Sequence, residues 1–276
     1  MTHNLIIRAA KKEDEQDIQE ISRLTWDGQD YIYEVFEEWL RDGHFFVAEI
    51  NNKVIGTAKL TIFPDKVGWL EGLRVHPEYR GQGIGRKLQD FTREYGLNLI
   101  RKGLINCLEF STYYKNQRSI QMALKDGFRI VKRFYILSRK RTEEKEKPDF
   151  TEIRMEDLIN FNKYLSMGWR FLHKIQEALE WMLNHITPYK IGAYKFYQYR
   201  ATNTFTLLQF TEEAVKAYIK ALNWISERAG FSNYEIILPE ESKDSIPIFK
   251  KYDFYFWDKP EEANIYVFRY ILKKYG

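Results

Sequence analysis

The chain has 276 residues, which is enough for one large domain or two of ordinary size. It has 43 Lys and Arg residues and 39 Asp and Glu residues, mixed along the chain, which argues against a nucleic-acid protein with a concentrated basic face. The single cysteine, Cys107, cannot form an intramolecular disulfide, the five histidines are scattered, and no apolar run approaches the roughly 18 residues of a membrane span. We therefore expect a cytoplasmic protein with no metal, nucleic-acid or membrane partner.

The first half of the chain alternates between strand and helix patterns, read from the spacing of its apolar residues. The predicted elements are strand Leu5–Ala9, helices Lys12–Thr25 and Ile32–Leu40, strands His44–Ile50, Lys53–Ile62 and Val67–Val75, helix Gly83–Lys102, strand Leu104–Thr112, helix Gln117–Lys125 and a terminal strand pair in Phe128–Ser138. This order predicts an α+β domain with a mixed sheet.

A charged stretch without an apolar face, Arg139–Asp149, marks the predicted domain boundary. We place a linker at 141–149, between a domain at 1–140 and a second at 150–276. The second half is predicted to contain helix Glu156–His185 with a break near Gly168, strands Tyr189–Arg200 and Asn203–Phe210, a helix from Thr211 to Gly230, strand Tyr234–Leu238, helix Ser242–Tyr252, and strands Phe254–Trp257 and Asn264–Leu272.

Residues 68–92 are predicted to form a strand, a tight loop and a helix. Pro77 lacks an N–H group and ends the strand. Gly81, Gly83 and Gly85 permit backbone angles that a side chain would forbid. The free N–H groups of the helix start therefore lie on a glycine-rich loop beside Arg80, which predicts a phosphate-binding site. The glycine spacing fits neither a Walker loop nor the dinucleotide fingerprint.

Val75, Pro77, Arg80, Gly83 and Gly85 match the pattern of the GNAT acetyltransferases, Val-x-x-Pro-x-x-Arg/Gln-x-x-Gly-x-Gly/Ala with slight variation before the Arg. The chain resembles one domain of that family over residues 3–140. In the family, this loop holds the pyrophosphate of acetyl-coenzyme A and the preceding strand pairs with the pantetheine arm. The resemblance therefore implies a GNAT fold and assigns cofactor contacts to Leu73, Arg74, Val75, Arg80, Gly81, Gln82, Gly83, Ile84, Gly85 and Arg86.

Acetyl transfer to an amine needs a proton acceptor, a donor for the oxyanion and a proton for the leaving thiolate. Glu71 is our candidate base, because strand alternation would place it on the same face as Leu73 and Val75; the other interpretation is a solvated or salt-bridged strand residue. The family implies the backbone N–H of Leu73 as the oxyanion donor.

The thiolate acid is where this sequence departs from the family pattern. Asn116 and Ser119 match the family's next helix, and the resemblance implies cofactor contacts for both, with Asn116 bonding the pantetheine arm. The usual tyrosine position is occupied by Ala123, which cannot donate a proton. Tyr113 and Tyr114 are the candidate replacements, and the alternative is that they only line the cleft with aromatic rings.

The loop between the first two helices roofs the substrate site in this family. Here it carries Trp26, Asp27, Asp30 and Tyr31, whose carboxylates could attract a cationic amine and whose rings could stack on it. The alternative is that an aspartate here only caps the second helix.

The second half repeats the element order of residues 67–138, and Ser245–Phe254 aligns with Ser119–Phe128. It is interpreted as a degenerate GNAT-like copy; the alternative is an unrelated α+β domain. Its long helix begins Thr211-Glu-Glu213, and acidic side chains at a helix start would repel a pyrophosphate. We expect no cofactor in this half.

The sequence thus predicts an acetyl-coenzyme A-dependent N-acetyltransferase that acts by direct attack of a primary amine, on a small-molecule amine or an amino acid. It leaves a homodimer open. Two alternatives are a catalytically silent coenzyme A-binding sensor or scaffold, and a protein acetyltransferase acting on N-termini or lysines.

Overall fold

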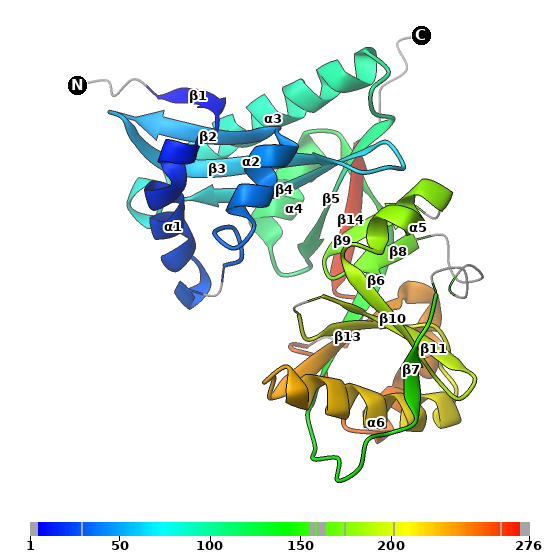
Figure 1. Cartoon of the computed structure of the whole chain (residues 1–276). Helices are drawn as coiled ribbons and strands as arrows, with labels where there is room; N and C mark the ends of the chain where they lie inside the picture. Colours follow the sequence, from blue (N-terminus) through cyan, green and yellow to red (C-terminus); the bar gives the residue numbers. More distant parts are fainter. Residues whose placement is uncertain are drawn as a thin grey trace. The chain divides into compact units, whose positions relative to one another are not determined.

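The computed structural model describes residues 5–28, 30–154, 158, 164–173, 175–200, 202–259 and 261–270. The chain divides into two compact units, Met1–Phe110 and Ser111–Gly276, each with its own helices and strands (Figure 1). Within the described residues, no helix is long and apolar enough to cross a membrane.

Unit 1 is a sheet with helices on both faces. Its elements are β1 (Ile6–Ala9), α1 (Glu15–Arg23), α2 (Phe36–Asp42), β2 (Phe45–Ile50), β3 (Lys53–Ile62), β4 (Val67–Val75), α3 (Ile84–Arg101) and β5 (Cys107–Tyr113), which runs across the boundary. The strand order is β1-β2-β3-β4-β5, antiparallel except for the parallel pair β4–β5. Val47 packs with α1 and α2, whereas its neighbour Ala48 packs with α3, because successive strand residues point to opposite faces.

A bulge in β4 changes the direction of its side chains. Thr57 of β3 pairs with Arg74, and Lys59 pairs with Glu71, so one residue of β3 lies opposite two residues of β4. Gly72 lies in this bulge with a φ of +65°, and a Cβ atom there would lie 2.6 Å from a ring atom of α2. Only glycine fits this position without displacing the helix.

The bulge shows that one prediction was wrong, namely that Glu71, Leu73 and Val75 share a face of the sheet. Leu73 and Val75 pack against the core cluster that includes α3. Glu71 is instead the direct partner of Lys59, whose ammonium group donates to the carbonyl of Gly43 at the end of α2. Glu71 therefore belongs to the face that α1 and α2 cover.

Unit 2 also contains strands that pair in both directions. Its elements are α4 (Gln117–Lys125), β6 (Phe128–Lys140), β7 (Phe150–Glu152), β8 (Tyr164–Met167), β9 (Arg170–His173), α5 (Gln176–Met182), β10 (Ile186–Ile191), β11 (Tyr194–Tyr199), β12 (Thr204–Leu207), α6 (Glu212–Arg228), β13 (Asn233–Pro239), α7 (Ile246–Lys251) and β14 (Ile265–Tyr270). The strand order β7-β10-β11-β12-β13 is antiparallel except for the parallel pair β12–β13. This repeats the order and directions of β1 to β5 in unit 1, as the predicted duplication requires.

The second half differs from the prediction in several segments. The predicted strand Phe254–Trp257 forms an isolated bridge between Tyr255 and Ser138. The predicted helix Glu156–His185 contains a β8–β9 hairpin that turns at Gly168, which has a φ of +58°. Among its described residues, the α-helical part is α5. Residues 155–157 and 159–163 of that prediction lie outside the described residues. The predicted strand Tyr189–Arg200 is a hairpin that turns at Gly192. Both glycines adopt left-handed angles, which reverse the chain where an uninterrupted element was expected.

The single long strand β6, predicted as a strand pair, joins two partners. Its first half pairs with β14, from Phe128–Tyr270 to Phe134–Ile265, and its second half pairs with β13, from Phe134–Pro239 to Lys140–Asn233. Residues 111–140 therefore pack with the second half of the chain. This is why the compact units meet at 110/111, whereas we had placed the boundary at a linker over 141–149.

The charged segment 141–149 is also held by unit 2. Asn223, which is fully buried, accepts from the Thr142 backbone N–H at 3.1 Å and donates to the Glu144 carboxylate at 2.8 Å. Arg141 pairs with Glu227 at 2.9 Å. The first residues of the segment are therefore bonded to α6, whereas residues 145–147 are exposed.

Burial of Glu235 on β13 predicts a pH-dependent stability. Burial raises the pKa of its carboxyl from 4.5 to about 7, against a smaller opposing effect of a hydrogen bond with Thr204. The folded state then binds the proton more tightly than the unfolded chain, so stability should fall as pH rises from 4.5 to 7, by up to about 3 kcal/mol. Glu235→Gln should remove this loss in urea unfolding at pH 5 and pH 8. Exposed Glu240→Gln is the control, and an equal pH slope in wild type and Glu235→Gln would contradict the prediction.

Candidate active site

The loop between β4 and α3 leaves the start of a long helix open. Gly81 and Gly83 have φ angles of +80° and +79°, and a Cβ atom on either would meet nothing within 4 Å. The glycines are therefore required by the backbone angles rather than by lack of space. Among the described residues, no side chain caps α3 at Gly83, and its first turn, from Ile84 on, has no acidic residue. The backbone N–H groups in the first turn of α3 can therefore donate hydrogen bonds to an anionic ligand.

Two arginines flank this loop, and they differ in what they bond. The Arg80 guanidinium donates from Nε to the carbonyl of Val75 at 3.0 Å, which ties it to the end of β4 while the residue stays exposed. Arg86, one turn into α3, pairs with Asp90 at 2.8 Å. Gln82 donates to the carbonyl of Glu78 at 3.4 Å. Arg80 is therefore the better placed cation for a phosphate on this loop.

The corresponding helix of unit 2, α6, begins differently. Thr211 caps it by accepting from the backbone N–H of Ala214 at 3.3 Å, and Glu212 and Glu213 occupy its first turn. Hydrogen bonds from Lys251 and Tyr252 lower the pKa of Glu212 to about 2, so the carboxylate is ionised. The protein's own groups fill the place that a phosphate would take.

The parallel pairing of β4 with β5 is short. It includes Val67–Cys107, Gly68–Leu108 and Trp69–Glu109, and β4 continues beyond it to Val75. This part of β4 carries the bulge and the residues that the family resemblance assigns to the pantetheine arm.

The candidate base Glu71 lies next to the end of this pairing, in a polar row across three strands. Its Oε1 atom accepts a hydrogen bond from the Thr61 hydroxyl of β3 at 2.6 Å. Thr61 is the register partner of Trp69, which in turn pairs with the fully buried Glu109. Lys59, also fully buried, lies opposite Glu71. We did not single out Thr61, Lys59 or Glu109 from the sequence, although β3 carries a polar residue at every second position from 57 to 61.

The loop between α1 and α2 closes on β4 through Arg74. Asp30 accepts from the guanidinium at 2.9 and 3.2 Å, and its side chain is fully buried. The Trp26 ring centroid lies 4.1 Å from the guanidinium carbon and that of Tyr31 lies 5.8 Å away. Arg74 and Asp30 therefore neutralise each other within the protein. Trp26, at 61% exposure, and the exposed Asp27 are the predicted substrate residues that a ligand can reach.

Tyr113, the last residue of β5, and Tyr114, which follows it, belong to unit 2. Tyr113 donates its hydroxyl to Asp258 at 2.8 Å, and burial followed by this bond raises its pKa above the usual range. Tyr114 donates to the carbonyl of Lys259 at 2.8 Å. Neither hydroxyl can protonate a thiolate without first giving up its present acceptor.

Asn116 caps α4, because its Oδ1 accepts from the backbone N–H of Ser119 at 3.3 Å and its Nδ2 donates to Thr112 at 3.1 Å. Ala123, at the family's tyrosine position, is fully buried. Helix capping alone can therefore explain why Asn116 and Ser119 occur at the spacing that the family shows.

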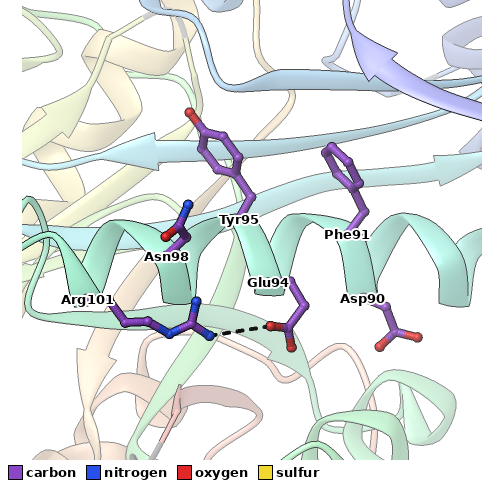
Figure 2. A pocket seen from close by; sticks show the side chains of 6 residues that line it. All are labelled: Asp90, Phe91, Glu94, Tyr95, Asn98 and Arg101. Carbon is purple, nitrogen blue, oxygen red and sulfur yellow. Dashed lines mark ion pairs between the residues drawn. The ribbon is translucent and has the colours of Figure 1, made fainter.

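A hollow on the surface of unit 1 lies along α3. Figure 2 shows that its lining side chains all project from α3, and Glu94 pairs with Arg101 at 3.7 Å. The lining contains none of the predicted site residues: it consists of Asp90, Phe91, Glu94, Tyr95, Asn98 and Arg101. In the described part of the chain, no group of three or more His, Cys, Asp or Glu side chains could hold a metal ion.

Residues 14–128 match the model of the acetyltransferase (GNAT) family. A curated protein of Archaeoglobus fulgidus, described as an uncharacterized N-acetyltransferase, is 36% identical over 113 residues, covering 35% of this chain and 76% of that protein. The chain belongs to the GNAT acetyltransferase family. Each match covers only part of the chain. The residues that match the family model include the glycine-rich loop and Glu71.

Solved structures extend the likeness in fold to the whole GNAT chain. A proposed acetyltransferase from Thermoplasma acidophilum matches with a TM-score of 0.65 at 17% identity, over 97% of this chain and 100% of that one. A GCN5-related N-acetyltransferase from Sphaerobacter thermophilus matches with a TM-score of 0.65 at 11% identity, over 96% and 95%. The fold is thus α+β of the GNAT type, and the second half is part of it.

Proposed function

We propose that this GNAT protein transfers an acetyl group from acetyl-coenzyme A to a primary amine of a small molecule or amino acid. The observation that carries the proposal is the start of α3, where two left-handed glycines present uncapped N–H groups beside Arg80. The backbone from Gly81 to Arg86 would hold the pyrophosphate. By family resemblance, the backbone of Leu73 and Val75 would hold the pantetheine arm.

Bound acetyl-coenzyme A supplies the acetyl group as an activated thioester. In the transfer, a C–N bond to the amine forms, the C–S bond breaks, the amine loses a proton and the sulfur gains one. Glu71 takes the proton from the amine in this proposal, because it is a half-buried carboxylate on β4 next to the bulge. Trp26 and Asp27 would contact the acceptor amine, because the Asp30 carboxylate is already paired with Arg74.

The cofactor part of the proposal predicts a loss of ligand stabilisation in Gly83→Asp. The aspartate would place a carboxylate at the uncapped start of α3, where it repels a phosphate. The left-handed φ of +79° also strains any residue other than glycine there, so the control must carry the same strain. Acetyl-coenzyme A at 100 times its Kd should stabilise the wild type by about 2.7 kcal/mol in a thermal-shift titration and leave Gly83→Asp unshifted.

The matched control is Gly103→Asp, because Gly103 also has a positive φ, of +70°, with nothing within 4 Å of a Cβ, but lies beyond the other end of α3. It should keep the full shift. Two results would contradict a cofactor site on this loop. One is a wild-type protein that acetyl-coenzyme A does not stabilise, and the other is a Gly83→Asp protein that it stabilises as much as wild type.

A silent coenzyme A-binding protein is the second candidate. Ala123 offers no hydroxyl at the usual tyrosine position, and the hydroxyls of Tyr113 and Tyr114 are already donated to Asp258 and Lys259. Thiol release from acetyl-coenzyme A in the presence of a panel of primary amines separates the two candidates. Release that depends on the amine supports the transferase, and binding without release supports the silent protein.

A further inference from the structure

Strand β3 carries three buried polar residues on the face that α1 and α2 cover, and each bonds a specific group. The Thr57 hydroxyl donates to the carbonyl of Gly72 in the bulge at 2.7 Å. The Lys59 ammonium donates to the carbonyl of Gly43 at 2.8 Å. Lys59 also pairs with the carboxylate of Asp42. The Thr61 hydroxyl donates to the carboxylate of Glu71, the candidate base. Buried polar groups are stabilised only when they are bonded, so each contact holds its residue in place.

We propose that Thr61 is a positioning residue, which orients the Glu71 carboxylate as the proton acceptor of the reaction. The inference rests on the proposed function and deepens it. The 2.6 Å distance from Oγ1 to Oε1 falls in the range of a charge-assisted bond from a hydroxyl to an ionised carboxylate.

The surroundings of Thr61 restrict how this hydroxyl can point. Thr61 is 7% exposed, and its register partner Trp69 is 2% exposed, so both side chains are enclosed. A β-branched side chain has few χ1 choices, and a packed one keeps a single choice. The donor direction is therefore set by β3, and the carboxylate rotates to meet it. A general base gains from such fixed orientation, since proton transfer requires alignment with the reacting nitrogen.

The test is a double-mutant cycle. Thr61→Val keeps the shape of the side chain but removes the donor, and Thr61→Ser restores the donor. With the amine that gives the fastest thiol release from acetyl-coenzyme A, Thr61→Val should lower kcat about tenfold and leave the KM for acetyl-coenzyme A unchanged. Thr61→Ser should recover most of the rate. In a Glu71→Gln background, Thr61→Val should have no further effect, because Thr61 acts only through Glu71.

The control for loss of a buried threonine hydroxyl is Thr92→Val. The Thr92 hydroxyl donates to the carbonyl of Leu88 within α3, and the residue is 3% exposed. Its kcat should match wild type. Equal losses in Thr61→Val and Thr92→Val, or a full further loss in the Glu71→Gln background, would overturn the inference.

A second cycle, on stability, keeps the inference testable without turnover. Urea unfolding of the same four proteins at pH 7 should show coupling between Thr61 and Glu71, and absence of coupling would overturn the inference. Failure of the proposed function looks different: wild type binds acetyl-coenzyme A but releases no thiol with any amine. That result would also remove the role assigned to Thr61, even if the coupling is found.

Discussion

Replacing Glu71 by Gln is expected to lower kcat by about 10²- to 10⁴-fold, the usual contribution of a general base. Gln keeps the shape of the side chain and can still accept from the Thr61 hydroxyl, so the fold should be retained. It cannot take the proton from the amine. Binding of acetyl-coenzyme A should be unchanged, because the phosphate loop begins at Arg80, after β4 has ended. Steady-state thiol release and the thermal-shift titration measure the two properties separately.

Glu94→Gln is the matched control, since Glu94 lies on the exposed side of α3 and pairs with Arg93 and Arg101. It should keep the wild-type rate. A Glu71→Gln protein with wild-type kcat would show that another group takes the proton. Fully buried Glu109, in the same polar row, would then be the next carboxylate to replace.

Val267→Asp in β14 is expected to cost more than about 4 kcal/mol of folding stability, enough to unfold many proteins. Val267 is fully buried and pairs with Lys132 of β6. A carboxylate at this position would lose its hydration within the core without a built partner. Because β6 also pairs with β13, we expect the damage to spread through the sheet of unit 2. Urea unfolding, followed by far-ultraviolet circular dichroism, measures the loss.

The same substitution one residue earlier provides the control. Tyr266 points to the other face of β14, is only half-buried, and lies 5.4 Å from the Arg133 guanidinium. Tyr266→Asp should therefore cost less, since its carboxylate is partly hydrated and faces a cation. Similar losses for the two variants would mean that β14 is not a core strand of this sheet.

Local sequence determined the elements whose stability depends on near neighbours. Helix Gln117–Lys125 was predicted with the bounds that α4 has, because its apolar spacing and the capping Asn116 are local features. The glycine-rich loop and the start of α3 followed from backbone angles that only glycine adopts readily. The order of strands and helices in the first half was likewise predictable from periodicity together with the family pattern.

Other features depend on partners far along the chain. The pairing of Asp30 with Arg74 joins residues 44 positions apart, and no local pattern shows that one neutralises the other. Apolar runs within 164–173 fit a buried helix or a strand equally well, and the hairpin is decided by its tertiary packing. The shared strand β6 pairs with two later strands, so the compact boundary could not be read from the charged segment.

The sequence by itself determined the family, the phosphate loop and the two-part repeat. Glycine angles, helix periodicity and element order depend on short stretches of chain and can be read from them. Only the tertiary structure decided which face of the sheet Glu71 occupies and which hydroxyl bonds it. A one-residue bulge at Gly72 reverses the direction of every later side chain in β4, and the bulge exists because β3 and α2 pack against it.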